Sequence, residues 1–399
     1  MTDMNNWKKE KLGDVCEFYN GKAHEKSIDK NGKYKVVNSK FVSSNGEKAK
    51  RTDNAQFPLF KDDIVMVMSD VPNGKTLAKC FLIDKEDTYT LNQRVCAIRT
   101  NNFDKQFLYY QLNRNKYLLD FNNGENQTNL RKDDILNCEL LIPPLREQQR
   151  IVVILDEAFA AIAKAKANAE QNLKNAKDLF ESYLQNVFET KGDGWVENKL
   201  GEVCELINRG VSPKYLEKNG IIVLNQKCIR DHKISFEQSR FHDGITKKVN
   251  PEKMIKLGDV LINSTGTGTL GRVAQVREEL ENVTVDSHVT IVRPVPDLFF
   301  IDFFGWALIF IEDEIAKRGD GCGGQTELAR TTLKNDFTIC FPKSLKEQQT
   351  IVQKLDALSI ETKKLEAIYQ QKIADLEELK KSVLQKAFSG GLKEKLVTT

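Results

Sequence analysis

The sequence of 399 residues has few of the side chains that proteins use to bind zinc. It contains four histidines, and none of its eight cysteines forms a Cys-x-x-Cys pair. Because zinc sites are built from closely spaced cysteines and histidines, no metal site is expected. We expect the cysteines to be reduced thiols of a cytoplasmic protein; they lie at positions 16, 80, 96, 138, 204, 228, 322 and 340.

Long apolar runs and targeting segments are also missing. The most apolar stretch, 298–311, is 14 residues long and includes Asp302. That is too short to cross a bilayer and predicts a buried helix. The first residues are polar and lysine-rich, unlike a secretory signal peptide, which again favours the cytoplasm.

Recognisable catalytic motifs do not occur. There is no Asn-Pro-Pro-aromatic motif of an amino-methyltransferase, no Gly-x-Ser-x-Gly and no nuclease-like Asp-x-Glu-x-Lys cluster after a strand. Cys16 and Cys204 occupy matching apolar positions, so we interpret them as small buried hydrophobes and not as nucleophiles. The sequence therefore predicts a chain that is not itself an enzyme.

The charge of the chain is unevenly distributed. The formal net charge is only +3, but residues 22–51 hold nine Lys/Arg against three Asp/Glu, and residues 209–253 hold ten against five. Two separate basic stretches on an otherwise acidic chain are typical of patches that bind a polyanion. Two solvated basic loops are the alternative.

An internal duplication decides the domain organisation. Residues 7–17 read Trp-Lys-Lys-Glu-Lys-Leu-Gly-Asp-Val-Cys-Glu, and residues 195–205 read Trp-Val-Glu-Asn-Lys-Leu-Gly-Glu-Val-Cys-Glu. Residues 145–156 recur at 345–356 with eight of twelve positions identical. The offset grows from 188 to 200, so the second copy is longer by 12 residues between these blocks. The chain is a tandem duplication of one domain plus one helix.

Each copy has the same predicted order of elements. Two apolar strands are followed by an apolar helix, a glycine-containing loop, a strand that ends near proline, and a long helix. The predicted strands are 34–38 and 64–68 in the first copy and 221–225 and 260–262 in the second. The predicted apolar helices are 107–121 and 299–315, and Pro143, Pro144 and Pro342 precede the long helices.

The two long helices, 146–188 and 346–388, contain neither Pro nor Gly. Each has an apolar seam that alternates steps of three and four residues, as in coiled coils. The first seam is rich in alanine and the second in leucine, so we expect the helices to pack on each other. Packing of each helix on its own domain is the alternative. The seam positions are Leu155, Ala158, Ile162, Ala165, Ala169, Asn172, Ala176, Leu179 and Tyr183 in the first helix, and Leu355, Leu358, Thr362, Leu365, Tyr369, Lys372, Leu376, Leu379 and Val383 in the second.

Two stretches resemble nucleotide-binding loops without matching them. Residues 69–76 end in Gly-Lys-Thr but begin with Ser69 and contain Pro72. Residues 266–271 fit Gly-x-Gly-x-x-Gly, yet a strand-like segment follows where that fingerprint opens a helix. Since Thr76-Leu-Ala-Lys79 aligns with Thr269-Leu-Gly-Arg272, we predict that both are the same strand–turn–strand loop.

These features together resemble the specificity subunits of type I restriction-modification systems, over nearly the whole chain. The specific marks are the two Leu-Gly-x-Val-Cys-Glu starts, the Asn-Ser-Thr-Gly-Thr-Gly-Thr-Leu-Gly-Arg segment at 263–272, and the repeated Leu-[Arg/Lys]-Glu-Gln-Gln. Gln-Thr-Asn-Leu at 127–130 and Gln-Thr-Glu-Leu at 325–328 form another matching pair. The first copy departs from the pattern at 71–76, where a glycine-rich turn is expected.

The resemblance implies an α+β fold. Two similar mixed α/β target-recognition domains would be joined by two long helices that form an antiparallel coiled coil with pseudo-two-fold symmetry. The expected segments are a first target-recognition domain at 1–145, a central helix at 146–189, a second domain at 190–342, a C-terminal helix at 343–391 and a tail at 392–399.

The resemblance also implies the function. The chain would recognise a bipartite DNA target with an unread gap and would direct adenine methylation and DNA cleavage by its partners. The expected partners are double-stranded DNA, two modification (methyltransferase) subunits and the restriction (translocase/endonuclease) subunits, with no membrane involved. The chain itself would need no cofactor, because S-adenosylmethionine, ATP and Mg would be bound by the partner subunits.

Base reading needs polar side chains with paired donors and acceptors, and phosphate binding needs Lys, Arg and turn amides. Asn38 and Asn225, each at the end of a strand, form the best-matched pair, although an Asn there can also bond its own turn. The DNA-binding candidates of the first copy are Lys22, Asn38, Ser39, Lys40, Lys75, Gln127 and Asn129. Those of the second copy are Arg209, Tyr215, Asn225, Gln226, Lys227, Arg230, Thr267, Arg272, His288 and Gln325.

Two other functions stay open at the level of sequence. One is a stand-alone nuclease or NTPase that uses the loop at 69–76, and the other is a coiled-coil scaffold with no role in DNA binding. We also expect the long helices to bind a modification subunit, since Phe159, Phe180 and Ile360 have no evident partner within the predicted seam.

Overall fold

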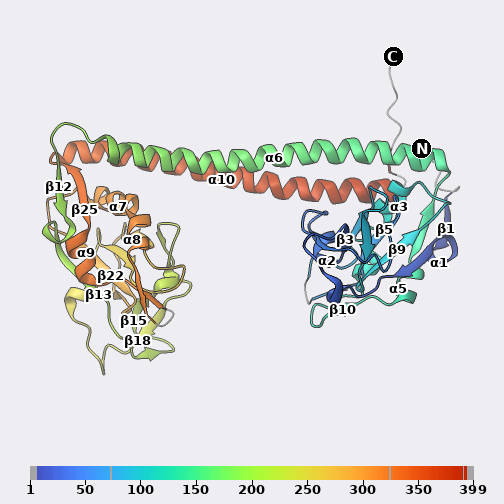
Figure 1. Cartoon of the computed structure of the whole chain (residues 1–399). Coiled ribbons are helices and arrows are strands. Elements are labelled where there is room, and N and C mark those ends of the chain that lie inside the picture. Colours follow the sequence, from blue (N-terminus) through green and yellow to red (C-terminus); the bar gives the residue numbers. More distant parts are fainter. Residues whose placement is uncertain (1–6, 72–73, 323–324, 390, 393–399) are drawn as a thin grey trace, which may run out of the picture. The chain divides into compact units, whose positions relative to one another are not determined.

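The computed structural model describes residues 7–71, 74–322, 325–389 and 391–392. The described chain forms two compact units (Figure 1). Unit 1 comprises residues up to 169 together with those from 371 onward, and unit 2 comprises residues 170–370. Each unit therefore contains one globular domain and one half of each long helix.

Unit 1 is a mixed domain of short strands and helices. Its elements are β1 (Lys8–Lys11), α1 (Leu12–Val15), β2 (Glu17–Asn20), η2 (Glu25–Ser27), β3 (Tyr34–Val37), α2 (Ser39–Ser43), β4 (Lys50–Thr52), β5 (Ile64–Val67), β6 (Ser69–Asp70), β7 (Cys80–Leu82), β8 (Tyr89–Leu91), β9 (Val95–Arg99), α3 (Lys105–Leu112), α4 (Lys116–Leu119), β10 (Thr128–Asn129), α5 (Lys132–Leu136), β11 (Glu139–Ile142) and the first part of α6 (Leu145–Thr190).

Unit 2 repeats this order with additional strands. Its elements are β12 (Trp195–Lys199), η3 (Leu200–Glu202), β13 (Cys204–Arg209), β14 (Tyr215–Leu216), β15 (Ile221–Leu224), η4 (Gln226–Cys228), β16 (Ile229–Arg230), β17 (Lys233–Ile234), β18 (Arg240–His242), η5 (Pro251–Lys253), β19 (Val260–Asn263), β20 (Val273–Gln275), β21 (Val283–Val285), β22 (Val289–Pro294), α7 (Ile301–Phe310), α8 (Glu312–Lys317), β23 (Asp320–Cys322), β24 (Gln325–Glu327), α9 (Arg330–Asp336), β25 (Thr338–Pro342) and the first part of α10 (Leu345–Phe388).

The sheets of the two units correspond strand by strand. An antiparallel sheet has the order β2-β9-β5-β7 in unit 1 and β13-β22-β19-β20 in unit 2. A second sheet has the order β4-β3-β8 in unit 1, and in unit 2 it has the order β14-β18-β15-β21. The last two strands in each order are parallel to each other, β3 with β8 and β15 with β21. Among the described residues, unit 2 adds the edge strand β14.

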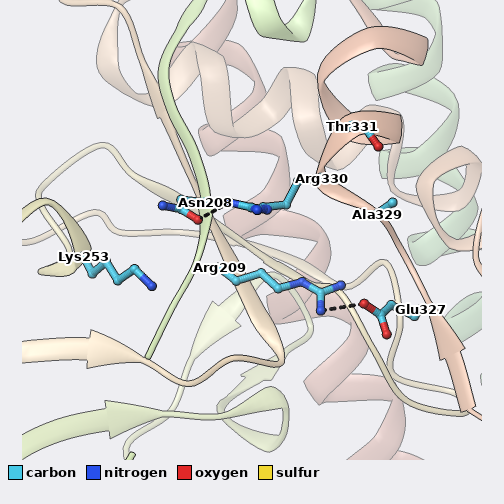
Figure 2. A pocket seen from close by; sticks show the side chains of 7 residues that line it. All are labelled: Asn208, Arg209, Lys253, Glu327, Ala329, Arg330 and Thr331. Atoms are coloured by element: carbon cyan, nitrogen blue, oxygen red, sulfur yellow. Dashed lines mark hydrogen bonds and ion pairs between the residues drawn. The ribbon is translucent and has the colours of Figure 1, made fainter. Parts of the chain in front are cut away.

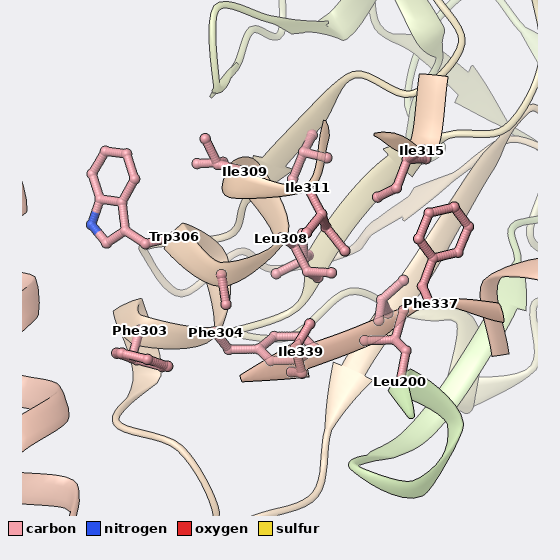
Figure 3. Close-up of a cluster of buried hydrophobic side chains, with 14 of the residues drawn as sticks. Leu200, Phe303, Phe304, Trp306, Leu308, Ile309, Ile311, Ile315, Phe337 and Ile339 are labelled. Carbon is pink, nitrogen blue, oxygen red and sulfur yellow. The ribbon is translucent and has the colours of Figure 1, made fainter. Parts of the chain in front are cut away.

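Apolar side chains from the strands and from the helix that follows them form the core of each unit. In unit 2, Phe303, Phe304 and Leu308 of α7 are fully buried and pack with Leu200 and Ile339 of neighbouring segments (Figure 3). The strands β5 and β19 have no exposed residue, as the apolar runs 64–67 and 260–262 predict.

The apolar helix predicted after the strands was wrong as a single element in both copies. In unit 1 it is interrupted between α3 and α4, where Arg114 has a φ of 60° and Asn115 caps α4 by accepting a hydrogen bond from the Tyr117 amide at 3.0 Å. In unit 2 it divides into α7 and α8 at Ile311. A capping Asn inside an apolar run ends one helix and begins the next.

The long helices α6 and α10 pair antiparallel within each unit. In unit 1, Leu155 of α6 packs in one cluster with Val383 and Ala387 of α10, and in unit 2 Leu184 of α6 packs with Leu355 of α10. The same clusters contain side chains of the globular domains. Each helix therefore packs both on the other helix and on the domain of that unit, so the two alternatives stated for the sequence are both realised.

The predicted seam is only partly correct. The positions Leu155, Ile162, Ala169 and Ala176 of α6 are buried, but Leu179 is 52% exposed. Leu379 of α10 is also about half exposed. A straight helix with 3.6 residues per turn drifts from a strict seven-residue repeat, so the later seam positions turn toward solvent.

Two aromatic residues that lacked a predicted partner have one in the structure. Phe159 packs edge-on against Tyr110, with ring centroids 5.3 Å apart, and Phe180 packs on Trp306 at 5.4 Å. The expectation that Phe159 and Phe180 have no partner within the chain was therefore wrong, because aromatic side chains of the domains cover them. Ile360 is 55% exposed.

The repeated Leu-x-Glu-Gln-Gln block has a clear structural role. The Gln148 side chain accepts a hydrogen bond from the Asp104 amide at 2.9 Å and donates one to the Pro143 carbonyl at 2.9 Å. Gln348 makes the same pair of bonds, from the Phe300 amide at 2.7 Å and to the Pro342 carbonyl at 2.8 Å. These buried amides fix the start of each long helix to its domain.

Among the described residues, no helix is both long and apolar enough to cross a membrane.

Candidate nucleic-acid interface

A polar groove of about 590 Å³ lies in unit 2, and five of the predicted DNA-binding residues line it. We call it the Tyr215 groove. Strands β15 and β18, whose ends border it, lie at the end of unit 2 away from α7 and the long helices (Figure 1). Its lining residues are Tyr215, Asn225, Gln226, Lys227, Glu237, Gln238, Ser239, Arg240, Gly266, Thr267, Thr269 and Asp286.

Side-chain amides hold the loops around the Tyr215 groove together. Asn225 accepts a hydrogen bond from the Lys227 amide at 2.9 Å and donates one to the Gln238 carbonyl at 2.6 Å. The Gln226 side chain accepts a hydrogen bond from the Thr269 hydroxyl at 2.7 Å. These bonds join three separate loops, so the groove has a defined shape without a ligand.

Two cationic side chains face this groove and Asp286 lies at its base. The guanidinium carbon of Arg240 lies 3.8 Å from the centroid of the Tyr215 ring. Lys227 is exposed. The Asp286 side chain is 4% exposed, and burial raises the pKa of its carboxyl above the ordinary range, opposed by the amide of His288. The exposed surface of the groove therefore has paired amides and cations, the groups that bind base edges and phosphates.

Arg209 lies in a second groove of unit 2, of about 500 Å³ (Figure 2). Its guanidinium contacts the Glu327 carboxylate at 2.7 Å and donates to the Leu328 carbonyl at 2.9 Å. Beside it, Arg330 donates to the Asn208 side chain at 2.6 Å. The ion pair fixes the Arg209 side chain at the wall of this groove.

The remaining candidates of unit 2 are dispersed. His288 is exposed and contacts the Thr265 hydroxyl at 2.7 Å, and Arg272 donates to the Gly268 carbonyl at 3.0 Å. Arg230 is exposed in the hairpin β16–β17, whose turn lines a different groove beside α8 and α10. The structure therefore does not bring Arg230 to the Tyr215 groove. Gln325 begins β24, and its side chain lies outside the described part of the chain.

Asn38 and Asn225 occupy equivalent places in the two units. Their backbone angles are almost identical, φ −115° and ψ 178° for Asn38, and φ −116° and ψ 177° for Asn225. Each caps the helix that follows, and Asn38 accepts a hydrogen bond from the Phe41 amide at 2.9 Å. Both side-chain oxygens thus bond their own turn, the second of the two roles stated for them.

The other candidates of unit 1 form two groups. Asn129 lines a groove of about 310 Å³ together with Asn20, Ser69 and Arg94, and Gln127 reaches this groove by donating to the Ser69 hydroxyl at 2.9 Å. The other group surrounds the end of β3: Lys22, Ser39 and Lys40. Lys75 is exposed in the loop that follows β6.

An internal carboxylate fills the loop that resembles a phosphate-binding loop. Burial raises the pKa of Asp70, but hydrogen bonds from Thr76, Val71 and Leu77 outweigh burial and hold the pKa below its ordinary value. The Thr76 and Leu77 amides donate to its carboxylate at 2.6 and 3.1 Å. These amides already bind an anion, so they do not form a free phosphate cradle.

The strand–turn–strand prediction for both nucleotide-like loops is confirmed. β5 and β7 pair antiparallel across the first loop, and β19 and β20 pair antiparallel across the second.

Among the described residues there is no cluster of three or more His, Cys, Asp or Glu side chains that could hold a metal ion.

Several residues of these grooves were missed in the sequence. Arg240 and Gln238 line the Tyr215 groove, Arg330 lies beside Arg209, and Arg94 lies in the groove of unit 1. The sequence contains a signal for Arg94, because Asn92-Gln-Arg-Val95 aligns with Asp286-Ser-His-Val289. The structure agrees with this alignment, since the Arg94 carbonyl accepts from the Met68 amide as the His288 carbonyl accepts from the Ser264 amide. Matching the predicted His288 to the first copy would have selected Arg94.

Comparisons with known proteins agree with one another. The profile of a family described as the type I restriction modification DNA specificity domain matches residues 4–174 and 192–377. The specificity subunit of the type I restriction enzyme EcoBI from Escherichia coli is 26% identical over 339 residues, which cover 76% of this chain and 69% of that protein.

Two solved structures are similar over nearly the full chain. One comes from work on complex assembly and conformational transition of the type I R-M system, with a TM-score of 0.78, 21% identity, and 97% and 98% of the two chains covered. The other is the HsdS subunit from Thermoanaerobacter tengcongensis, with a TM-score of 0.58, 21% identity and 97% of both chains covered. At this identity the likeness shows the fold.

Proposed function

The chain belongs to the type I restriction-modification DNA specificity family, and we propose that its two units each read one half of a bipartite DNA target. The sequence between the two half-sites is not read. The specificity subunit directs its partners to the target, and the long helices set the length of the gap.

One observation carries the proposal of two reading units. In the second sheet of each unit, one strand, β3 or β15, is followed by a capping Asn and a helical turn. The backbone angles of Asn38 and Asn225 agree within a few degrees. The loops beyond this point differ in sequence and length. Equal frameworks with different loops are suited to two half-sites of different sequence, because loops carry specificity on a rigid scaffold.

Catalysis resides in the partners and not in this chain. The loop at 69–76 supports this proposal, since the Thr76 and Leu77 amides are occupied by Asp70. Methylation of adenine by two modification subunits with S-adenosylmethionine, and ATP- and Mg-dependent cleavage by restriction subunits, complete the proposed complex in the cytoplasm. ATP hydrolysis by the purified chain that disappears on Lys75→Ala would favour the rival NTPase.

Mapping of methylated adenine at base resolution tests the proposal. Cells that carry this chain with the modification subunits of its system are compared with cells that lack only this chain. We expect one bipartite motif with a fixed gap that depends on the chain. If methylation is the same in both cells, or if the chain with its partners does not bind DNA at low salt, the long helices serve a scaffold with no DNA role.

A further inference from the structure

The contact between Arg240 and Tyr215 distinguishes unit 2 from unit 1. The guanidinium carbon of Arg240 lies 3.8 Å from the centre of the Tyr215 ring, closer than any other cation lies to a ring among the described residues. Tyr215 is nevertheless 42% exposed. An exposed Arg that rests on an exposed aromatic ring keeps its donors available while losing rotational freedom.

The strands around this pair explain its geometry. Arg240 begins β18, and β18 lies between β15 and the additional strand β14, which begins with Tyr215. Tyr215 is paired with His242, so the Tyr215 ring and the Arg240 side chain extend from neighbouring strands. The buried His242 ring, which accepts from the Lys214 amide at 2.9 Å, fixes β14 at this edge.

No carboxylate neutralises the Arg240 guanidinium. Among the ion pairs between described residues, none involves Arg240, although Glu237 and Asp286 also line the Tyr215 groove. Arg209 differs in this respect, because Glu327 holds its guanidinium at 2.7 Å. In the Tyr215 groove, Arg240 is therefore a cation that is both oriented by a ring and available to a ligand.

The internal duplication gives a matched position in unit 1. β4 pairs with β3 as β18 pairs with β15, and Val36 faces Lys50 as Val223 faces Arg240. Lys50 is exposed, and the described residues of unit 1 form no strand equivalent to β14. Among the described residues, no aromatic ring lies under Lys50. The two units therefore present different chemistry at one equivalent point.

We propose that Arg240, oriented by Tyr215, reads a guanine in the half-site bound by unit 2. The guanidinium fork matches the O6 and N7 acceptors of guanine in the major groove, which a lysine ammonium matches less well. Lys50 contacts a phosphate at the equivalent point of unit 1 and reads no base. This inference rests on the proposed function, since it assigns one base contact within it.

The experiment compares Arg240→Lys with the wild-type chain in the complete modification complex, using a duplex DNA library randomised at both half-sites. Arg240→Lys keeps the charge and loses the fork. We expect the preference for guanine at one position of one half-site to fall roughly ten- to a hundred-fold, with the other half-site and the gap unchanged. Tyr215→Leu removes the ring and is expected to weaken the same preference, whereas Tyr215→Phe keeps the ring and is expected to resemble the wild type.

Lys50→Ala is the matched control. It is expected to weaken binding at all sequences and to relax no base preference. If Arg240→Lys selects the same bases as the wild type, Arg240 contacts only phosphate and the inference is overturned. If the wild-type complex itself selects no bipartite sequence, the proposed function fails before this inference is reached. Circular dichroism of each variant checks that the chain remains folded.

Discussion

At the scale of single residues, the duplication provides an internal comparison of backbone conformation. Ala78 and Gly271 occupy equivalent positions, because each amide donates a hydrogen bond to a carbonyl of the preceding strand. The Ala78 amide donates to Val67, and the Gly271 amide donates to Asn263. Both have a left-handed φ, 55° for Ala78 and 88° for Gly271. A left-handed conformation costs alanine about 1–2 kcal/mol and costs glycine almost nothing.

We predict that Ala78→Gly stabilises unit 1 by about 0.5–1 kcal/mol, since relief of this strain exceeds the entropy that glycine loses on folding. Gly271→Ala is the matched control and is expected to destabilise unit 2, because its Cβ would lie 2.7 Å from the Ala316 backbone. Thermal denaturation of both variants provides the measurement. A lower melting temperature for Ala78→Gly would contradict the strain argument.

The turn at Asp243 predicts a pH dependence. Hydrogen bonds from the Thr246 side chain and amide hold the pKa of Asp243 below its ordinary value. Asp243 accepts from the Thr246 amide at 2.9 Å and from the Ile245 amide at 3.1 Å. A folded-state pKa below that of the unfolded chain stabilises the turn above the unfolded value and loses this effect as pH falls through the folded value.

We therefore predict that amide exchange of residues 245–246, corrected for the intrinsic rate, is equally protected from pH 7 to about pH 4 and loses protection only at lower pH. Asp243→Asn removes the charge and is expected to lower the protection throughout this range. Loss of protection in the wild type between pH 7 and 5 would show that another group controls the turn.

Single side chains were the hardest part of the site to predict. The sequence favours Asn38 and Asn225 as base readers and leaves open that each bonds its own turn; in the structure their side-chain oxygens accept hydrogen bonds from amides of the next turn. Arg240 was missed because its value as a ligand depends on Tyr215, which lies 25 residues earlier in the sequence. Such contacts follow from sheet pairing, which one sequence does not specify.

At the scale of secondary-structure elements, the junction between domain and long helix depends on one glutamine in each copy. Gln348 is fully buried and bonds the Phe300 amide and the Pro342 carbonyl. We predict that Gln348→Ala destabilises unit 2 by at least about 1–3 kcal/mol, the cost of a buried polar group left without a partner. Urea denaturation followed by tryptophan fluorescence, to which Trp195 and Trp306 of unit 2 contribute, measures this change.

The neighbouring Gln349 provides the control. It belongs to the same repeated block but is exposed. We expect Gln349→Ala to change the unfolding free energy by less than about 0.5 kcal/mol. Equal effects of the two substitutions would mean that helix propensity, and not the buried hydrogen bonds, controls the junction.

Elements were predicted well where the sequence pattern was long and regular. The predicted bounds of the long helices, 146–188 and 346–388, differ from α6 and α10 by two residues or fewer. The shorter apolar helix was wrong, because the interruption at Arg114 follows from capping by Asn115, and apolar content does not reveal it. The edge strand β14 has two residues and gives no period at all.

At the scale of the whole molecule, the duplication separates two properties that a single domain would combine. In the proposed function, the loops of each unit determine which bases are read, and the helices that both units share determine the distance between the two readings. Residues 190–342 include the Tyr215 groove but exclude almost all of α6 and α10. Base reading and spacing are therefore predicted to change independently.

We predict that exchange of residues 190–342 for the equivalent region of a relative replaces one half-site and leaves the other half-site and the gap unchanged. The physical reason is that α6 ends at Thr190 and α10 begins at Leu345, so the exchange conserves both helices. Methylated-site sequencing of cells with the exchanged chain is the measurement. A change confined to the gap would assign base reading to the helices and contradict the proposal.

Lengthening both helices tests the converse. The boundary between the units crosses α6 after Ala169 and α10 after Gln370, so equal insertions at these points leave each domain with its own helix segments. Seven residues add about 10 Å to a helix, which corresponds to roughly three base pairs at about 3.4 Å each. Four residues add about 6 Å, or one to two base pairs.

We expect the shorter paired insertion to widen the gap by one or two base pairs while the bases of both half-sites stay the same. The longer insertion rotates one reading unit around the duplex by a large fraction of a turn, so binding falls before a new gap is accepted. An insertion in α6 alone is the control, because it shifts α6 against α10 and breaks the packing of the clusters that contain Leu155 with Val383 and Leu184 with Leu355. Methylated-site sequencing distinguishes the outcomes: if a paired insertion alters the bases that are read, spacing and reading are not separate, and the helices do more than set a distance.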